Sequence, residues 1–340
     1  MKYLLILFTL STTGAFAQSK EYIKFEYDGY TFPILVRGNI ESDKMLVYVE
    51  GGPGETAIDF ARSDYPRWKK SLENEVAIAY YDQRGHNQSA KKMDVSKISY
   101  DQYSFDLIAI SKMLKEKYNA EVYLFGHSAG GYMVLHTLQY FADQSSFIDG
   151  AIAANTPITS DHSPERYQYY RPRYLKNLAA EKIANNKNGE FWQQELDWIN
   201  SIDSITTREG AIRWNRTVEK AFTPTKRKLS PGMAVKVIFS RPYNPVRYLN
   251  RKDNELIDDL LWEDRKTHSD FDNLSAINEN VLLITGRYDD VAPPEEMEEA
   301  NQRIEHSELV ILPDAAHESY LDQPNLFNEA ILSFINKYRK

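Results

Sequence analysis

The sequence contains no cysteine in its 340 residues. Disulfide bonds are therefore excluded, and so are metal sites built from thiolate ligands. A chain of this length can bury a core large enough to be stable without such cross-links, even outside a reducing compartment. Its length fits one domain of about 250 residues that carries an insertion.

The sequence also lacks an apolar run long enough to span a bilayer, which takes about 20 residues. The apolar stretch at residues 3–10 follows Lys2 and precedes a small-x-small tripeptide at residues 15–17. This order is typical of a secretory signal peptide. We expect residues 1–17 to be removed before Gln18 and the mature protein to be periplasmic or extracellular. The sequence has no cysteine that could carry a lipid, so we expect no lipoprotein anchor.

Histidine clusters and an excess of basic charge are absent as well. The seven histidines are scattered, without a His-x-x-x-His pair or a neighbouring carboxylate cluster, and the formal net charge is −8. We therefore expect no metal site and no cofactor. An acidic balance disfavours nucleic acid and anionic lipid as partners, and favours small neutral or cationic substrates.

Strand-like and helix-like segments alternate through much of the chain. Residues 22–37 alternate about Asp28 and Gly29, as an edge hairpin does. This rhythm predicts an α/β fold with a mostly parallel sheet and helices on both faces. The remaining predicted strands are 45–49, 76–81, 122–125, 148–153, 281–284 and 309–312, and the predicted helices of this part are 60–72, 100–118 and 131–141.

The alternation stops between residues 158 and 277, where helical patterns and many tyrosines and tryptophans occur. A structureless segment of this length is unusual in a compact domain. We predict a helical cap over residues 158–277, inserted after the sixth strand and covering Ser128. The core would then comprise residues 18–157 and 278–340. Most aromatic residues of the cap are expected to form its own core, and the others to line a substrate pocket.

The pentapeptide Gly-His-Ser-Ala-Gly at residues 126–130 lies between a predicted strand and a predicted helix. A serine on so sharp a turn has a strained backbone, and glycines two positions away avoid collisions with neighbouring segments. Such a pattern arises by chance in roughly one chain in twenty of this composition, so the pentapeptide alone is a weak signal. If an acid and a histidine follow at suitable positions, Ser128 is predicted to be the nucleophile of an α/β-hydrolase.

The partners of such a serine follow in the order acid and then histidine, each after a late strand. Asp289 and His317 have these positions. Asp290 and Asp314 are rival acids, and Asp289 is preferred because it lies nearer its strand. We predict that Ser128 attacks a carbonyl carbon, that His317 moves the proton and that Asp289 orients the imidazole.

The oxyanion formed in such a reaction needs hydrogen-bond donors that already point toward it. One is expected to be the backbone N–H of Ala129, directly after the nucleophile. The glycine-rich segment at residues 50–54 follows an early strand. Its Gly52 N–H is predicted to be the second donor.

Three segments resemble the proline iminopeptidases. Residues 50–54, Glu-Gly-Gly-Pro-Gly, are similar to their His-Gly-Gly-Pro-Gly loop, residues 82–85 to their Asp-Gln-Arg-Gly loop, and residues 286–289 to the segment that carries their catalytic acid. The resemblance covers about residues 40–157 and 278–338. It implies an α/β-hydrolase fold and a serine aminopeptidase that releases N-terminal residues, usually proline, from peptides.

The resemblance also implies a carboxylate that binds the free amine of the substrate. Glu219 with Trp214, and Glu263, are candidates in the cap, and Glu50 stands where the family has histidine. We therefore expect an exported aminopeptidase acting on small peptides. A carboxylesterase acting on small acyl esters would use the same triad. A binding protein without catalysis is a third hypothesis, against which the complete triad argues.

Overall fold

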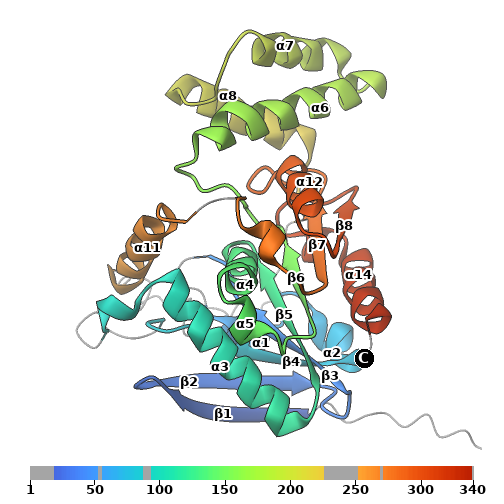
Figure 1. The fold of residues 1–340 in the computed structure, drawn as a ribbon. Coiled ribbons are helices and arrows are strands. Elements are labelled where there is room, and N and C mark those ends of the chain that lie inside the picture. Colours follow the sequence, from blue (N-terminus) through green and yellow to red (C-terminus); the bar gives the residue numbers. More distant parts are fainter. Residues whose placement is uncertain (1–18, 53–55, 87–92, 226–251, 269–270, 339–340) are drawn as a thin grey trace, which may run out of the picture.

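The computed structural model describes residues 19–52, 56–86, 93–225, 252–268 and 271–338 (Figure 1). The predicted signal peptide and residues 53–54 of the glycine-rich segment lie outside the described residues. In the described ranges, no helix is both long and apolar enough to cross a membrane.

The described strands form one eight-stranded sheet. They are β1 (Ser19–Tyr27), β2 (Tyr30–Gly38), β3 (Lys44–Val49), β4 (Ala77–Tyr81), β5 (Glu121–His127), β6 (Gly150–Ala154), β7 (Val281–Gly286) and β8 (Ser307–Leu312). Their order across the sheet is β1-β2-β4-β3-β5-β6-β7-β8. The pairs β1–β2 and β2–β4 are antiparallel and all other neighbours are parallel, which confirms the predicted hairpin and the mostly parallel sheet.

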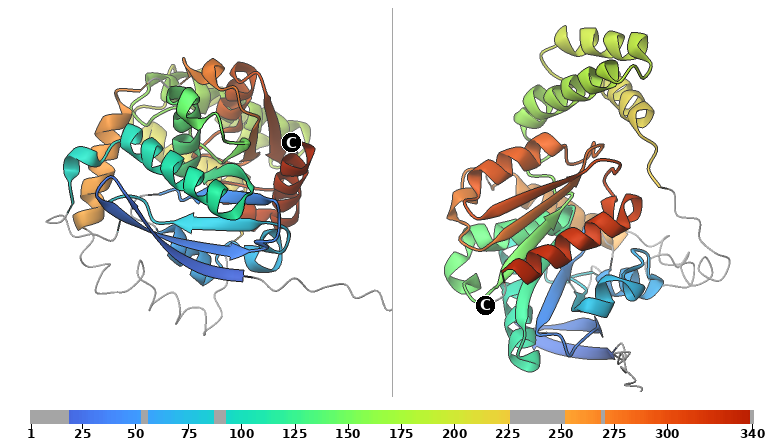
Figure 2. Two further views of the ribbon diagram at one scale, coloured as in Figure 1. Left: turned by 60° about the horizontal axis from the view of Figure 1, so that its bottom comes forward. Right: turned by 90° about the vertical axis from the view of Figure 1, so that its right-hand side faces the viewer.

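Helices cover both faces of the sheet (Figure 2). Strand β3 shows why its sequence is apolar throughout: Met45 and Val47 join one hydrophobic cluster, whereas Leu46 and Tyr48 join the cluster on the opposite face. The helices are α1 (Ala57–Ser63), α2 (Leu72–Glu75), α3 (Tyr100–Tyr118), α4 (Ala129–Tyr140), α5 (Ala142–Ser145), α6 (Arg171–Ala184), α7 (Gly189–Asn200), α8 (Arg208–Ala221), α11 (Lys252–Arg265), α12 (Pro294–Arg303), α13 (Ser319–Asp322) and α14 (Pro324–Lys337).

The prediction of one helix over residues 60–72 was wrong. Helix α1 ends at Ser63. The next residue, Asp64, has a left-handed backbone with φ 50°, and so has Arg67 with φ 59°. A 3-10 turn and the short α2 follow. The apolar spacing was misleading because Trp68 and Leu72 still face the core after the chain has turned.

The insertion between β6 and β7 is helical in its described part, but its helices lie in two places (Figures 1 and 2). Helices α6, α7 and α8 pack around Tyr174, Trp192 and Trp214 and stand away from the sheet. Helix α6 contacts the loop after β7, where Arg287 pairs with Glu181 at 2.8 Å. Helix α11 instead lies beside α3 on the core.

Candidate active site

Ser128 lies on the turn between β5 and α4 with φ 54° and ψ −125°, a strained conformation for a residue with a side chain. The glycines two positions before and two positions after Ser128 have no room for a side chain. A Cβ on Gly126 would lie 2.2 Å from the carbonyl oxygen of Gly130, and a Cβ on Gly130 would lie 2.1 Å from that of Val49. The predicted backbone of this turn is therefore confirmed.

The structure brings Ser128, His317 and Asp289 into one hydrogen-bonded line. Nε2 of His317 lies 3.0 Å from Oγ of Ser128, and Nδ1 lies 3.1 Å from each carboxylate oxygen of Asp289. The residues follow β5, β8 and β7, whose carboxyl ends share one edge of the sheet. Asp289 is fully buried, whereas the His317 side chain is 24% exposed.

Asp289 is held in place by several donors. Its Oδ1 accepts hydrogen bonds from the N–H groups of Val291 at 3.0 Å and Ala292 at 2.8 Å, and its Oδ2 accepts one from Nδ2 of Asn155 at 2.8 Å. Asn155 follows β6 and also donates to the carbonyl of Ala316. Asn155 was not predicted from the sequence as a residue of the site. The signal that could have identified Asn155 is its position as a polar residue directly after a buried strand.

The two rival acids have other surroundings. Asp290 is next to Asp289, and burial together with the negative charge of Asp289 raises the pKa of Asp290. Asp314 is exposed. Of the three carboxylates, Asp289 is the one that His317 contacts through Nδ1.

The surroundings of His317 favour its charged form. Burial lowers the pKa of its imidazole, but the charge of Asp289 and its hydrogen bond outweigh this effect, so the pKa lies above the ordinary value. Nε2 of His127 donates a hydrogen bond to the backbone carbonyl of His317 at 2.9 Å. Burial, with the nearby His317, lowers the pKa of His127 to about 3. His127 is therefore neutral and holds the loop that carries His317.

The predicted oxyanion donors both border the cavity above Ser128. Ala129 is the first residue of α4, where N–H groups have no acceptor within the helix. Gly52 has a positive φ of 84°. The chain before it runs directly against the nucleophile turn, since a Cβ on Gly51 would lie 2.2 Å from the carbonyl oxygen of His127.

A cavity of about 330 Å³ opens at Ser128 between the core and α11. Leu261 and Trp262 of α11 form part of its apolar wall. Its charged lining residues are Glu50, Asp161, Arg166, Asp258 and Arg265. The cavity thus combines an apolar surface with carboxylates and arginines in its wall.

Of the predicted substrate-binding residues, the structure brings only Glu50 to this cavity. Trp214, Glu219 and Glu263 are not among the residues that line it. Trp214 is buried in the core of α6, α7 and α8, since it lies on the apolar face of α8. Glu219 is exposed on the same helix, and Glu263 forms an ion pair with Lys266 at 2.5 Å on the outside of α11.

The chain belongs to the α/β-hydrolase fold family, which matches residues 44–324. Its sequence is similar to that of "Probable aminopeptidase YbaC" of Bacillus subtilis (strain 168), with 23% identity over 316 residues that cover 86% of this chain and 89% of that protein. Among solved structures, an esterase (EaEST) from Exiguobacterium antarcticum is similar with a TM-score of 0.59 and 17% identity, covering 93% of this chain and 98% of the esterase. A proline iminopeptidase of Mycobacterium smegmatis has a TM-score of 0.57 and 13% identity, covering 94% of this chain and 98% of that protein. At such identities, these structural similarities are evidence for the fold.

Proposed function

We propose that the protein is a serine hydrolase that works through an acyl-enzyme. The line of hydrogen bonds from Ser128 through His317 to Asp289 carries this proposal. His317 Nε2 accepts the proton of Ser128 Oγ while that oxygen attacks the substrate's carbonyl carbon. The N–H groups of Gly52 and Ala129 stabilise the oxyanion, each by about 3 kcal/mol of barrier.

The tetrahedral intermediate then loses its leaving group. The bond from the carbonyl carbon to the leaving nitrogen or oxygen breaks, and His317 gives its proton to that atom. In the second half, His317 accepts a proton from water, the water oxygen attacks the acyl carbon, and Ser128 Oγ leaves with the proton returned by His317. Asp289 stabilises the imidazolium in both halves.

We further propose that the substrate is a short peptide with a free N-terminus. The support is Glu50, a buried carboxylate in the wall of the nucleophile's cavity, whose Oε1 accepts from the N–H of Gly51 at 3.2 Å. Asp258 of α11 adds a second carboxylate to the same cavity. A substrate ammonium is attracted by carboxylates in the wall of its binding site. The similarity to a protein named as a probable aminopeptidase supports the same substrate.

A carboxylesterase is the competing function. The apolar part of the cavity, formed by Met133, Leu261 and Trp262, favours it because an acyl chain needs no charged partner. The catalytic residues would act on an ester as they act on an amide. Recognition of the amine therefore separates the two functions.

The deciding experiment is a substrate panel. Aminoacyl-naphthylamides with free and with blocked amines, and p-nitrophenyl butyrate, are measured with the wild type and with Glu50→Gln. We expect Glu50→Gln to lower kcat/KM for free-amine substrates by about 10- to 100-fold, the cost of one hydrogen bond to a charged group. Turnover of the ester should be nearly unchanged.

Glu219→Gln is the matched control, since Glu219 is exposed on α8 and outside the cavity lining. It should leave every substrate unaffected. Equal cleavage of free and blocked amines would refute the aminopeptidase and support the esterase. No turnover of any substrate would favour the binding protein.

The pH dependence tests the role of His317. This residue accepts a proton only as neutral imidazole, so kcat/KM is expected to fall as the pH is lowered. Since the pKa of His317 is raised above 6.5, the fall should have its midpoint above pH 6.5. The measurement is kcat/KM for the best substrate across the pH range, and activity that stayed constant down to about pH 5 would contradict the role.

We also propose a cap over residues 158–277 and export of the protein. Support for the cap is the helical insertion between β6 and β7, of which α11 borders the cavity. Export is supported by the pattern of residues 1–17. Mass spectrometry of the protein from the periplasm or medium would test it, with Gln18 as the expected first residue.

A further inference from the structure

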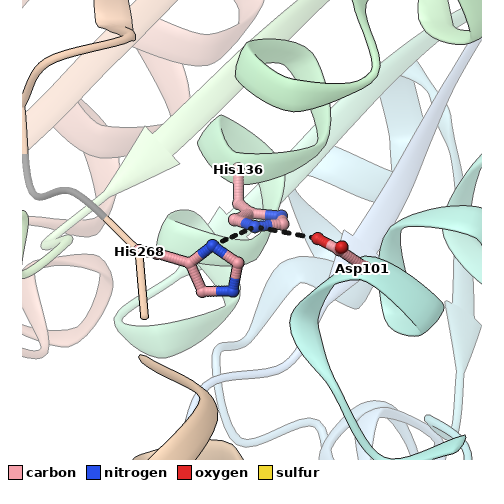
Figure 3. Close-up of side chains that lie close together, drawn as sticks. All are labelled: Asp101, His136 and His268. Carbon is pink, nitrogen blue, oxygen red and sulfur yellow. Dashed lines mark hydrogen bonds and ion pairs between the residues drawn. The ribbon is translucent and has the colours of Figure 1, made fainter. Parts of the chain in front are cut away.

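A second group of polar side chains lies away from the active site, where α3, α4 and the end of α11 meet (Figure 3). His136 of α4 is fully buried, Asp101 lies in the first turn of α3, and His268 follows α11. Nε2 of His136 lies 3.4 Å from Nδ1 of His268 and 3.4 Å from Oδ1 of Asp101. All three residues come from different elements, so their positions in the sequence gave no metal-binding pattern.

We propose that Asp101, His136 and His268 bind a zinc ion. Two imidazole nitrogens and one carboxylate oxygen form a ligand set that zinc accepts, with water at the fourth position. A tetrahedral zinc with bonds of about 2.0–2.1 Å has ligand atoms about 3.3 Å apart. Both distances from His136 Nε2 agree with this value. The third separation is within 4.8 Å, and the 55% exposed Asp101 side chain can rotate to shorten it.

His136 is held in place through its other ring nitrogen. Its Nδ1 lies 3.1 Å from Oγ of Ser104, which in turn accepts a hydrogen bond from Oγ1 of Thr137 at 2.9 Å. Thr137 Oγ1 also donates to the carbonyl of Met133 at 2.8 Å. These contacts orient the ring so that its Nε2 lies near both Asp101 and His268.

His268 approaches His136 from the segment after α11. Its Nδ1 lies 3.4 Å from Nε2 of His136, and its Nε2 lies 3.5 Å from Oδ2 of Asp264. Asp264 is itself fixed, since it accepts a hydrogen bond from the N–H of Tyr100 at 2.7 Å. Nε2 of His136, Nδ1 of His268 and a carboxylate oxygen of Asp101 therefore lie within 4.8 Å of one another, as the ligands of one ion do.

The position of this site indicates its effect. Helix α11 forms part of the wall of the active-site cavity, and His268 is three residues beyond its end. A bound ion would therefore link α11 to α3 and α4 of the core. Arg265 is an opposing charge nearby, but its guanidinium donates to the carbonyls of Ile158 and His268. The bound ion would have a structural role, and we expect it to raise the stability of the folded protein.

The test is zinc titration of the untagged full-length protein, because a polyhistidine tag would itself bind zinc. Isothermal titration calorimetry should give one equivalent for the wild type, and bound Co²⁺ should give the intense visible bands of a tetrahedral ion. Asp101→Asn and His268→Gln should weaken binding by at least about 100-fold, since each removes a ligand. Zinc should raise the Tm of the wild type but not of these variants.

His306→Gln is the control, since His306 is an exposed histidine outside the group. It should bind zinc as the wild type does. Circular dichroism of the metal-free variants shows whether they fold. Because the two variants remove different ligands, one of them still tests the proposal if the other does not fold. Absence of binding by the wild type, or unchanged binding by both folded ligand variants, would overturn the proposal and leave the hydrogen bond between His136 and His268 as the explanation for their contact.

Discussion

Replacing Ser128 with alanine is expected to lower kcat about a million-fold, the scale on which a serine hydrolase loses activity without its nucleophile. The reason is that His317 would have no hydroxyl at 3.0 Å from which to take a proton, so no acyl-enzyme forms. A fluorophosphonate probe should label the wild type on Ser128 and leave Ser128→Ala unlabelled. Kinetics on the best substrate and mass spectrometry of the labelled protein are the two measurements.

The matched control for this experiment is Ser146→Ala, which removes a hydroxyl from an exposed serine. Its kcat and its labelling should equal those of the wild type. The small size of alanine leaves the turn at residue 128 free of new contacts, so the variant should still fold. If Ser128→Ala kept its labelling, or lost less than about tenfold in kcat, another residue would be the nucleophile.

The hydrogen-bonded line of Ser128, His317 and Asp289 could be predicted because each of these residues follows a strong local signal. Buried parallel strands are continuous apolar runs, and the polar residues after them meet at one edge of the sheet. Ser128 also required glycines at fixed positions, because a Cβ at Gly126 or Gly130 would collide with neighbouring backbone atoms. Asp289 was chosen over Asp290 by its distance from the strand, and the structure gives it the contact with His317.

Contacts between distant elements could not be predicted from the sequence. Trp214 and Glu219 have a helical pattern that shows which face is apolar, but not which surface that face will cover. The apolar face of α8 packs on its own unit and leaves the cavity wall to α11. The contact of Asn155 with Asp289 and that of His136 with His268 were missed for the same reason, since each joins residues more than 100 positions apart in the chain.

Replacing Asp289 with asparagine is the second large effect, with an expected loss of about 10⁴-fold in kcat at neutral pH. Every close neighbour of this carboxylate is a donor: Val291 and Ala292 on Oδ1, Asn155 on Oδ2, and His317 on both oxygens. An amide has only one accepting oxygen, and the two backbone N–H groups would donate their hydrogen bonds to it. Its NH₂ group would then point toward His317 and impose the tautomer in which Nε2 carries the proton, so His317 could no longer accept one from Ser128.

Asp290→Asn is the matched control, because it changes the next residue in the same loop and makes the same chemical exchange. It should lose less than about tenfold in kcat, since Nδ1 of His317 keeps its contact with Asp289. The pH profiles add a second measurement. Asp289 is the main group that raises the pKa of His317, so the midpoint of the acid limb should move to lower pH in Asp289→Asn and much less in Asp290→Asn. The reverse order of the two variants, in rate or in midpoint, would make Asp290 the acid of the triad.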